Sequence, residues 1–368
     1  MMRTYLTTST ATYKAGISPG IKVLKIDSGP YAGRMAILMQ TSSSEIRLTY
    51  ADYPYTNWST PSVMVSDGAD YTFDAVMDNS GNIFLAYTLG TGYDLVCRTL
   101  SLVSGTWTAG TLHTVYNGDD NYYPSLARET SGRLWLCWSR FSSGQYYINI
   151  KSSDDSGATW GSGASDAGET LSGGDTQAYS KCLLFGSYLF VPYTLDGTRL
   201  AYRRRHLEST SWDDEADIST GSGYDHNFDA AVSTDGRLGI VFDDGKIGFR
   251  EFDGDHWGGI VVVDDAGGSF PQIKYFDNVP YLTYLREFGS GQEQILYSRR
   301  PGNSFSSPQI LDPRKSTLAK VFCYNSVSGS YEDVTAEASN DTSGDVVHSN
   351  SSALLKNTDD ALYLGLDA

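Results

Sequence analysis

The sequence predicts an all-β fold: a six-bladed β-propeller of four-stranded antiparallel blades, with a short C-terminal β appendage. Composition is the first reason. The 368 residues include 38 glycines, 26 tyrosines and 7 tryptophans, and only 19% are charged, which favours strands and tight turns over helices. The second reason is a strand–turn–strand pattern that recurs about every fifty residues, a period typical of propeller blades. A β-sandwich with chance periodicity is the alternative.

The first two strands of each predicted unit flank a turn. They are clearest in "FDAVMDNSGNIFLAY" from Phe73, "YPSLARETSGRLWLCW" from Tyr123 and "FDAAVSTDGRLGIVF" from Phe228. A two-strand turn needs a residue that tolerates positive φ, which glycine and asparagine do. The residues expected at this position are Gly33, Gly81, Gly132, Gly186, Gly236 and Asn278.

Each unit continues with a third strand and an aromatic residue that precedes a segment of small residues. These aromatics are Trp58, Trp107, Trp160, Trp212, Trp257 and Phe305. Two landmarks in the same phase predict six blades, at residues 21–67, 68–118, 119–172, 173–222, 223–264 and 265–313. We expect small residues such as Ala75, Ala127 and Ala230 on the innermost strands, and the aromatics between adjacent sheets.

The two ends of the chain are predicted to lie outside the six blades. Residues 1–20 are expected to form an N-terminal extension. Residues 314–368 break the phase of the repeat and are expected to form a linker and a partial C-terminal β segment, which ends on the strand-like "ALYLGL". We therefore expect the protein to be part of a longer polypeptide or assembly.

The charge balance excludes two classes of partner. With 44 acidic and 27 basic residues the net charge is −17, which disfavours binding to nucleic acid and insertion into or adhesion to an anionic membrane. The sequence shows no signal peptide and no apolar run of membrane-spanning length. It therefore predicts a soluble protein that is cytoplasmic, virion-associated or extracellular by a non-classical route.

Neither a cofactor nor a resident metal is predicted. The four cysteines, Cys97, Cys137, Cys182 and Cys323, lack C-x-x-C spacing, and buried free thiols are favoured over a disulfide or a metal site. No H-E-x-x-H motif or close histidine pair is present. Calcium held by aspartate and backbone oxygens is an alternative that the sequence does not locate.

One short motif is specific. Ser153, Asp155, Gly157, Thr159 and Trp160 in "SSDDSGATW" fit S-x-D-x-G-x-T-W. This segment resembles the Asp box, or BNR repeat, of the sialidase-like β-propellers, and the resemblance implies a structural corner on the face away from the substrate. Sialidases of that family carry an R-I-P motif on the first inner strand, whereas this strand reads "IKVLKIDSGPYAG". We therefore do not expect sialic acid hydrolysis.

Candidate ligand-binding residues gather at the opposite end of the predicted propeller. The loops that lead into the innermost strands and the loops after the second strands meet there, around the axial channel; we call this end the mouth. Its predicted ligand-binding residues are Asp70, Asp119, Asp120, Asn121, Tyr122, Asp175, Gln177 and Asn227. The alternative is that aspartate, asparagine and glycine are simply the residues from which turns are made.

Two arginines fall at the mouth end of second strands. Arg140 in "CWSRF" and Arg286 in "YLREF" belong to the third and sixth units and would face each other across the ring. A pair of guanidinium groups could bind the carboxylate of an acidic sugar. The alternative is that both are rim arginines paired with neighbouring aspartates.

The predicted catalytic residues are His226, Asp225 and Tyr224. Asp225 and Asn227 flank His226, and a carboxylate beside an imidazole can orient it as a general base or acid. The "DHN" segment also resembles the His-Asn segment of some BNR-type propeller polysaccharide lyases. A structural histidine bonded to the neighbouring loop is the alternative.

The sequence thus predicts a carbohydrate-binding propeller, a glycan recognition or adhesion module of phage or viral type, without sialidase activity. Exposed tyrosines and tryptophans would stack on sugars, and aspartate and asparagine would bind hydroxyls. The alternative is a glycan-degrading enzyme, a glycoside hydrolase or polysaccharide lyase, that acts on an acidic polysaccharide at the mouth of the channel.

Overall fold

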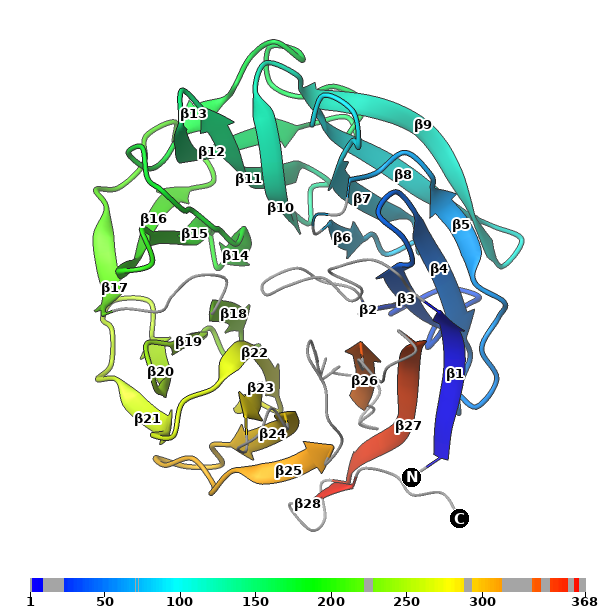
Figure 1. Cartoon of the computed structure of the whole chain (residues 1–368), viewed down its shortest axis with the longest axis vertical. Coiled ribbons are helices and arrows are strands. Elements are labelled where there is room, and N and C mark those ends of the chain that lie inside the picture. Colours follow the sequence, from blue (N-terminus) through cyan, green and yellow to red (C-terminus); the bar gives the residue numbers. More distant parts are fainter. Residues whose placement is uncertain are drawn as a thin grey trace.

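The structure is a computed structural model that describes residues 2–8, 23–69, 71, 73–221, 228–287, 293–312, 333–338, 345–356 and 361–363. Within these ranges every regular element is a β-strand. The strands form seven four-stranded antiparallel sheets arranged as a ring (Figure 1). Among these residues no helix is long and apolar enough to cross a membrane.

Six of the sheets are formed by consecutive strands and correspond to the six predicted blades. Blade one comprises β2 (Val23–Lys25), β3 (Met35–Gln40), β4 (Ile46–Ala51) and β5 (Ser62–Val65). Blade two comprises β6 (Asp74–Met77), β7 (Ile83–Thr88), β8 (Leu95–Val103) and β9 (Thr106–Tyr116). Blade three comprises β10 (Asp120–Arg128), β11 (Leu134–Ser142), β12 (Gln145–Ser153) and β13 (Glu169–Thr170).

The second half of the ring repeats this order. Blade four comprises β14 (Leu183–Phe185), β15 (Tyr188–Leu195), β16 (Arg199–His206) and β17 (Ala216–Thr220). Blade five comprises β18 (Phe228–Val232), β19 (Leu238–Asp243), β20 (Ile247–Phe252) and β21 (Val261–Asp264). Blade six comprises β22 (Ser269–Phe276), β23 (Val279–Glu287), β24 (Glu293–Arg299) and β25 (Gln309–Asp312). The predicted all-β, six-bladed propeller is confirmed.

The seventh sheet joins the two ends of the chain. It contains β1 (Met2–Thr8), β26 (Asp333–Ala338), β27 (Asp345–Lys356) and β28 (Ala361–Tyr363). β1 pairs with β27 in antiparallel register, from Met2 opposite Asn350 to Thr8 opposite Asp345. In Figure 1 this sheet lies in the ring between blade six and blade one. The N-terminal extension and the C-terminal appendage, predicted as separate segments, thus meet in one sheet.

The predicted landmarks occupy the expected positions within the blades. All six turn residues have positive φ, including Asn278 at 61°. Each of the later blade aromatics packs on the preceding blade, as when Trp107 meets Tyr50 at 5.5 Å between ring centroids and Phe305 meets Phe249 at 5.1 Å. Cys97, Cys137 and Cys182 are buried free thiols, as predicted, whereas Cys323 lies outside the described residues.

Buried carboxylates connect the innermost strands, and composition alone did not indicate them. Asp74 on β6 accepts a hydrogen bond from the backbone N–H of Leu126 on β10, at 2.7 Å. Asp229 on β18 accepts one from the N–H of Ile273 on β22, at 3.0 Å, and pairs with the ammonium group of Lys181. Asp229 and Lys181 are 5% and 7% exposed. Polar side chains therefore hold neighbouring blades together at the axis.

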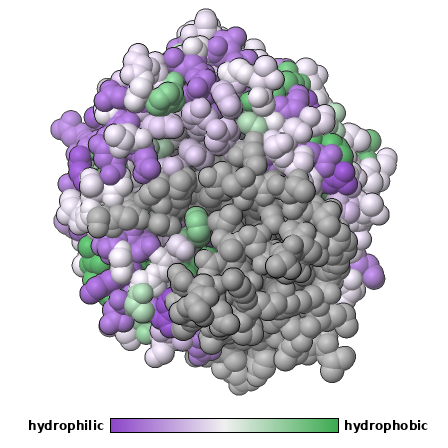
Figure 2. All heavy atoms as spheres, in the orientation of Figure 1, coloured by the Kyte–Doolittle hydropathy of each residue, from purple (hydrophilic) through white to green (hydrophobic). Residues whose placement is uncertain are grey.

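Hydrogen bonds between adjacent blades also build the mouth. The start of β10 bonds to the preceding blade through the N–H of Asn121 and the carbonyl of Tyr93, at 3.2 Å. The loop that leads into β14 bonds in both directions through Asp175 and Tyr146, at 2.7 and 2.9 Å. The loops of different blades are therefore fixed relative to one another. In the view of Figure 2 the coloured surface is mostly hydrophilic, with a few isolated apolar residues.

Candidate functional site

A group of tyrosine rings lies at the mouth, on blades two and three. We call Tyr71, Tyr93, Tyr122, Tyr123 and Tyr146 the tyrosine cluster. Tyr122 is at its centre, with ring centroids 4.7 Å from Tyr71, 5.7 Å from Tyr93 and 6.0 Å from Tyr146. Such edge-on and tilted contacts are the arrangement that aromatic pairs prefer. The cluster is therefore a continuous group of packed aromatic rings from two blades, in which Tyr122 is buried and the other four rings are partly exposed.

A β-bulge brings two adjacent tyrosines to the same surface. Successive side chains of a regular strand point to opposite faces of the sheet. The pairing of β10 with β11 shifts register between Tyr122 and Ser125, and Tyr123 has a φ of 53°, in the left-handed region. The rings of Tyr122 and Tyr123 consequently lie 6.0 Å apart. A bulge of this kind redirects a side chain, which is a common device beside functional sites.

A polar pocket of about 570 Å³ adjoins the tyrosine cluster. We call it the mouth pocket. Its walls are Ser43, Ser44, Ser66, Asp67, Gly68, Ala69, Tyr71, Gly90, Thr91 and Tyr93. Two of them, Tyr71 and Tyr93, belong to the cluster, so that the pocket and the aromatic surface are continuous. The volume lies within the range typical of small-molecule sites.

Two carboxylates border the far side of the cluster. Asp120 accepts a hydrogen bond from the hydroxyl of Tyr122, at 3.3 Å. Burial, with Asp120 nearby, raises the pKa of Tyr122, so that its phenol stays protonated. Asp175 bonds through its backbone to Tyr146, and its Oδ2 is buried without a hydrogen-bond partner among the described residues.

Asp175 holds its proton unusually tightly. Burial, with a smaller contribution from the carboxylate of Asp196, raises the pKa of Asp175 to about 7. Asp196 itself accepts hydrogen bonds from the hydroxyl and the N–H of Thr176, which lower its pKa. Environments that push the pKa values of two carboxyls apart are typical of acid–base sites. Among the described carboxyls at this mouth, Asp175 is therefore the one best placed to donate a proton near neutral pH.

We expect Asp175→Asn to stabilise the protein more at pH 8 than at pH 5. The folded pKa is raised, so wild-type stability falls as pH rises from the unfolded pKa of about 4 through about 7, and asparagine removes this loss. Because Asp175 is partly solvated, we expect a gain at pH 8 of about 1–2 kcal/mol. Denaturant unfolding of both proteins at the two pH values measures it; an equal effect at both would contradict the raised pKa.

The two predicted arginines are both ion-paired. Arg140 contacts Asp119 at 3.2 Å, and the hydroxyl of Tyr116 donates to the same carboxylate at 2.8 Å. Arg286 contacts Asp264 at 2.6 Å, where the hydroxyl of Tyr284 also donates, at 2.7 Å. Both therefore fit the alternative of rim arginines paired with neighbouring aspartates. An acidic sugar would have to compete with these carboxylates for either guanidinium group.

Asn121 requires a correction, because it is completely buried. Its amide donates to the carbonyls of Tyr93 and Asp119, and its oxygen accepts the indole N–H of Trp138 at 2.8 Å. It holds the loop together and does not face a ligand. Gln177 is exposed near Asp196. The remaining predicted residues, Asp70, Tyr224, Asp225, His226 and Asn227, lie outside the described residues.

The turn that resembles an Asp box lies on the face opposite the mouth. The carboxylate of Asp155 accepts the N–H of Thr159 at 2.8 Å and its hydroxyl at 2.6 Å, and the hydroxyl of Ser153 at 2.8 Å. These hydrogen bonds lower the pKa of Asp155 to about 2. Gly157 has a φ of 86°, and its carbonyl accepts the indole N–H of the buried Trp160. All five residues are engaged in closing the turn.

Sequence reasoning missed five residues of the site: Tyr71, Tyr93, Tyr123, Tyr146 and Asp196. The available signal was aromatic residues inside glycine-containing loops, as in "GTGYD" and "SGQYY". The described residues contain no group of three side chains placed to hold a metal ion. The functional groups at the mouth are therefore aromatic rings, carboxyls and hydroxyls.

Comparison with known proteins identifies similar folds. No protein-family model matches the sequence, and neither does any curated protein. A polysaccharide lyase, an ulvan lyase bound to -[GlcA(1-4)Rha3S]-, has a TM-score of 0.66 at 10% identity, over 94% of this chain and 95% of the lyase. The fucose-specific lectin from Aleuria aurantia has a TM-score of 0.53 at 13% identity, over 83% of this chain and 99% of the lectin.

Trypanosoma rangeli sialidase is also similar, with a TM-score of 0.49 at 13% identity, over 92% of this chain and 70% of the sialidase. At such identities the likenesses to the lyase and the lectin show the fold alone, a β-propeller as the repeat and the motif predict.

Proposed function

We propose that this chain is a carbohydrate-binding propeller, a glycan recognition or adhesion module whose binding surface is the mouth at blades two to four. The observation that carries the proposal is the tyrosine cluster, which lies between the mouth pocket and the carboxyls of Asp120 and Asp175. Sialic acid hydrolysis is not part of the proposal.

The chemistry of the surface suits a sugar chain. The faces of pyranose rings are apolar and stack on aromatic rings, whereas their edges carry hydroxyls that pair with carboxylates, serine and threonine. The mouth pocket offers hydroxyls and a carboxylate on one side of the cluster, and Asp120 and Asp175 lie on the other. A glycan could therefore run from the pocket across the rings. The polysaccharide lyase and the fucose lectin with this fold support a carbohydrate ligand.

Replacing Tyr146 by alanine is expected to weaken glycan binding about tenfold, because a stacked ring contributes about 1 kcal/mol beyond the area that it buries. Calorimetry or affinity electrophoresis with a panel of neutral and acidic polysaccharides measures the change. Tyr53→Ala is the matched control, since Tyr53 is 65% exposed and lies next to Tyr55, in the loop that follows β4. Equal losses in both variants, or no binding by the wild type, would contradict the proposal.

Cleavage of the bound glycan is the second candidate, and the raised pKa of Asp175 favours it. A protonated carboxyl can donate to a glycosidic oxygen in a hydrolase, or hydrogen-bond to the uronate carboxylate in a lyase. The substrate would be an acidic polysaccharide at the mouth. Tyr224, Asp225 and His226 remain predicted catalytic residues for this candidate.

A further inference from the structure

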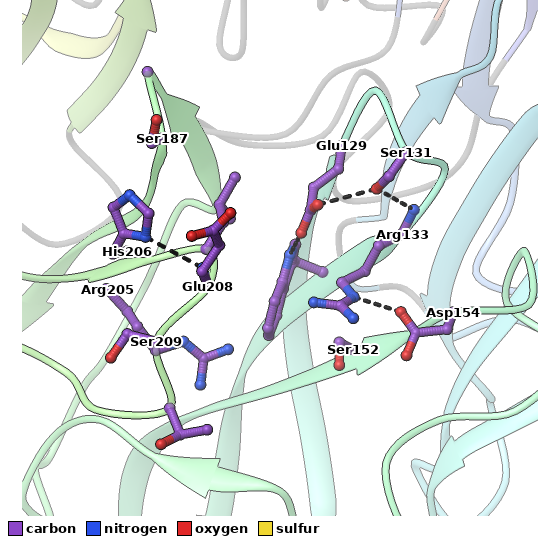
Figure 3. A pocket seen from close by; sticks show the side chains of 14 residues that line it. Glu129, Ser131, Arg133, Ser152, Asp154, Ser187, Arg205, His206, Glu208 and Ser209 are labelled. Atoms are coloured by element: carbon purple, nitrogen blue, oxygen red, sulfur yellow. Dashed lines mark hydrogen bonds and ion pairs between the residues drawn. The ribbon is translucent and has the colours of Figure 1, made fainter.

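A second pocket lies on the face opposite the mouth, at the junction of blades three and four. It has a volume of about 820 Å³, and we call it the junction pocket. Its walls are Glu129, Ser131, Arg133, Trp135, Ser152, Asp154, Gly186, Ser187, Arg205, His206, Leu207, Glu208, Ser209 and Thr210. In Figure 3 the labelled residues of blade three, including Arg133 and Asp154, face those of blade four, including His206 and Glu208.

Trp135 holds the polar groups at the base of this pocket in fixed positions. Its indole ring lies between two guanidinium groups, with the central carbon of Arg205 4.6 Å and that of Arg133 5.7 Å from a ring centroid. The indole N–H donates to Glu129 at 2.6 Å. Arg205 also pairs with Glu169 at 2.8 Å, and its side chain is only 8% exposed. Groups held in this way lose little freedom when a ligand binds.

Hydrogen-bond donors and acceptors that are still free face the pocket. Arg133 uses its Nε atom to bind Asp154, and its two Nη atoms make no hydrogen bond among the described residues. Asp154 accepts that bond at Oδ1 alone, and the exposed carboxylate of Glu208 accepts no hydrogen bond within the described part of the chain. Hydroxyls of Ser131, Ser152 and other residues complete the walls. Donors and acceptors therefore both line the cavity.

This chemistry selects one class of ligand. Apolar molecules would leave the polar walls without partners, which is costly. A simple anion gains little, because each guanidinium group already has a carboxylate partner, Asp154 for Arg133 and Glu169 for Arg205. The described residues also place no group of three side chains that could hold a metal ion. A molecule with many hydroxyl groups offers a donor and acceptors at each of them. We propose that the junction pocket is a second carbohydrate-binding site, for uncharged oligosaccharides, independent of the site at the mouth.

The test locates binding as well as measuring it. Neutral oligosaccharides from cellulose, xylan and mannan are added to the full chain, and hydrogen–deuterium exchange is followed by mass spectrometry. We expect one of them to protect residues 129–133 and 206–210. The double variant Arg133→Gln and Glu208→Gln should lose this protection and bind about tenfold or more weakly at this site, because hydrogen bonds to charged groups are lost.

The control and the outcomes separate the two sites. Arg237→Gln changes the equivalent turn arginine of blade five, which does not line the pocket, and should leave the protection intact. Protection confined to the mouth segments 119–123 and 142–147, or protection at 129–133 that persists in the double variant at unchanged affinity, would overturn the junction site. Binding of acidic oligosaccharides only would overturn the assigned class. Protection at 129–133 and 206–210 alone would support this site and count against the mouth.

Discussion

Replacing Asp229 by alanine is expected to lower the free energy of unfolding by about 3–5 kcal/mol, the range found when one partner of a buried ion pair is removed. Lys181 would keep its charge in a site where its side chain is only 9% exposed. The backbone N–H of Ile273 would also lose its acceptor. Asp229 touches blades four and six from blade five, so that one side chain couples three blades. Denaturant unfolding measured at constant pH gives the change.

A matched control and a rescue variant test this explanation. Asp235→Ala removes a carboxylate of the same blade that is paired with Arg237 at 2.8 Å but is 42% exposed, and should cost less than about 1 kcal/mol. Adding Lys181→Met to Asp229→Ala should recover part of the stability, because the buried charge is then gone. If Asp229→Ala costs no more than Asp235→Ala, the ion pair does not hold the blades together.

The blades could be predicted from sequence because their determinants are local. A turn that requires positive φ, such as that at Asn278, and an aromatic residue such as Trp107 recur within each unit and fix its phase. The seventh sheet depends instead on pairing between Met2–Thr8 and Asp345–Lys356, at opposite ends of the chain. No local sequence pattern indicates such pairing. The buried Asp229 was likewise missed, because a carboxylate is satisfied there only by partners from neighbouring blades.

The candidate site was predicted in outline only. Turn residues and alternating strands place the loops of all blades at one end, and this was sufficient to name Asp120, Tyr122 and Asp175. Which of the named side chains is free depends on contacts between blades. Asn121 is adjacent to Asp120 in sequence, yet its side-chain amide is fully used in hydrogen bonds to Tyr93 and Trp138. Arg140 is at the mouth, yet it is paired with Asp119.

If the chain cleaves its glycan, Asp175→Asn is expected to lower kcat by about 10²–10⁴-fold, the contribution typical of general acid–base catalysis. Binding should change little, since the amide keeps the size of the carboxyl. Product assays on acidic and neutral polysaccharides, for new reducing ends and for the absorbance of unsaturated uronates, distinguish hydrolysis from elimination. Wild-type protein that binds but releases no product between about pH 5 and 8 would exclude cleavage and leave recognition alone.

The pH profile separates a proton donor from a structural carboxyl. The acid form of Asp175 is present below its pKa of about 7, so the activity of the wild type should fall as pH rises through that value. Asp196 contributes to the raised pKa, and Asp196→Asn removes its charge while keeping an oxygen that can accept from Thr176. The fall in activity should therefore move to lower pH in Asp196→Asn. An unchanged pH profile of activity would show that Asp175 is not the titrating donor. If Asp175 only supported the loop, this profile would not shift when the charge of Asp196 is removed.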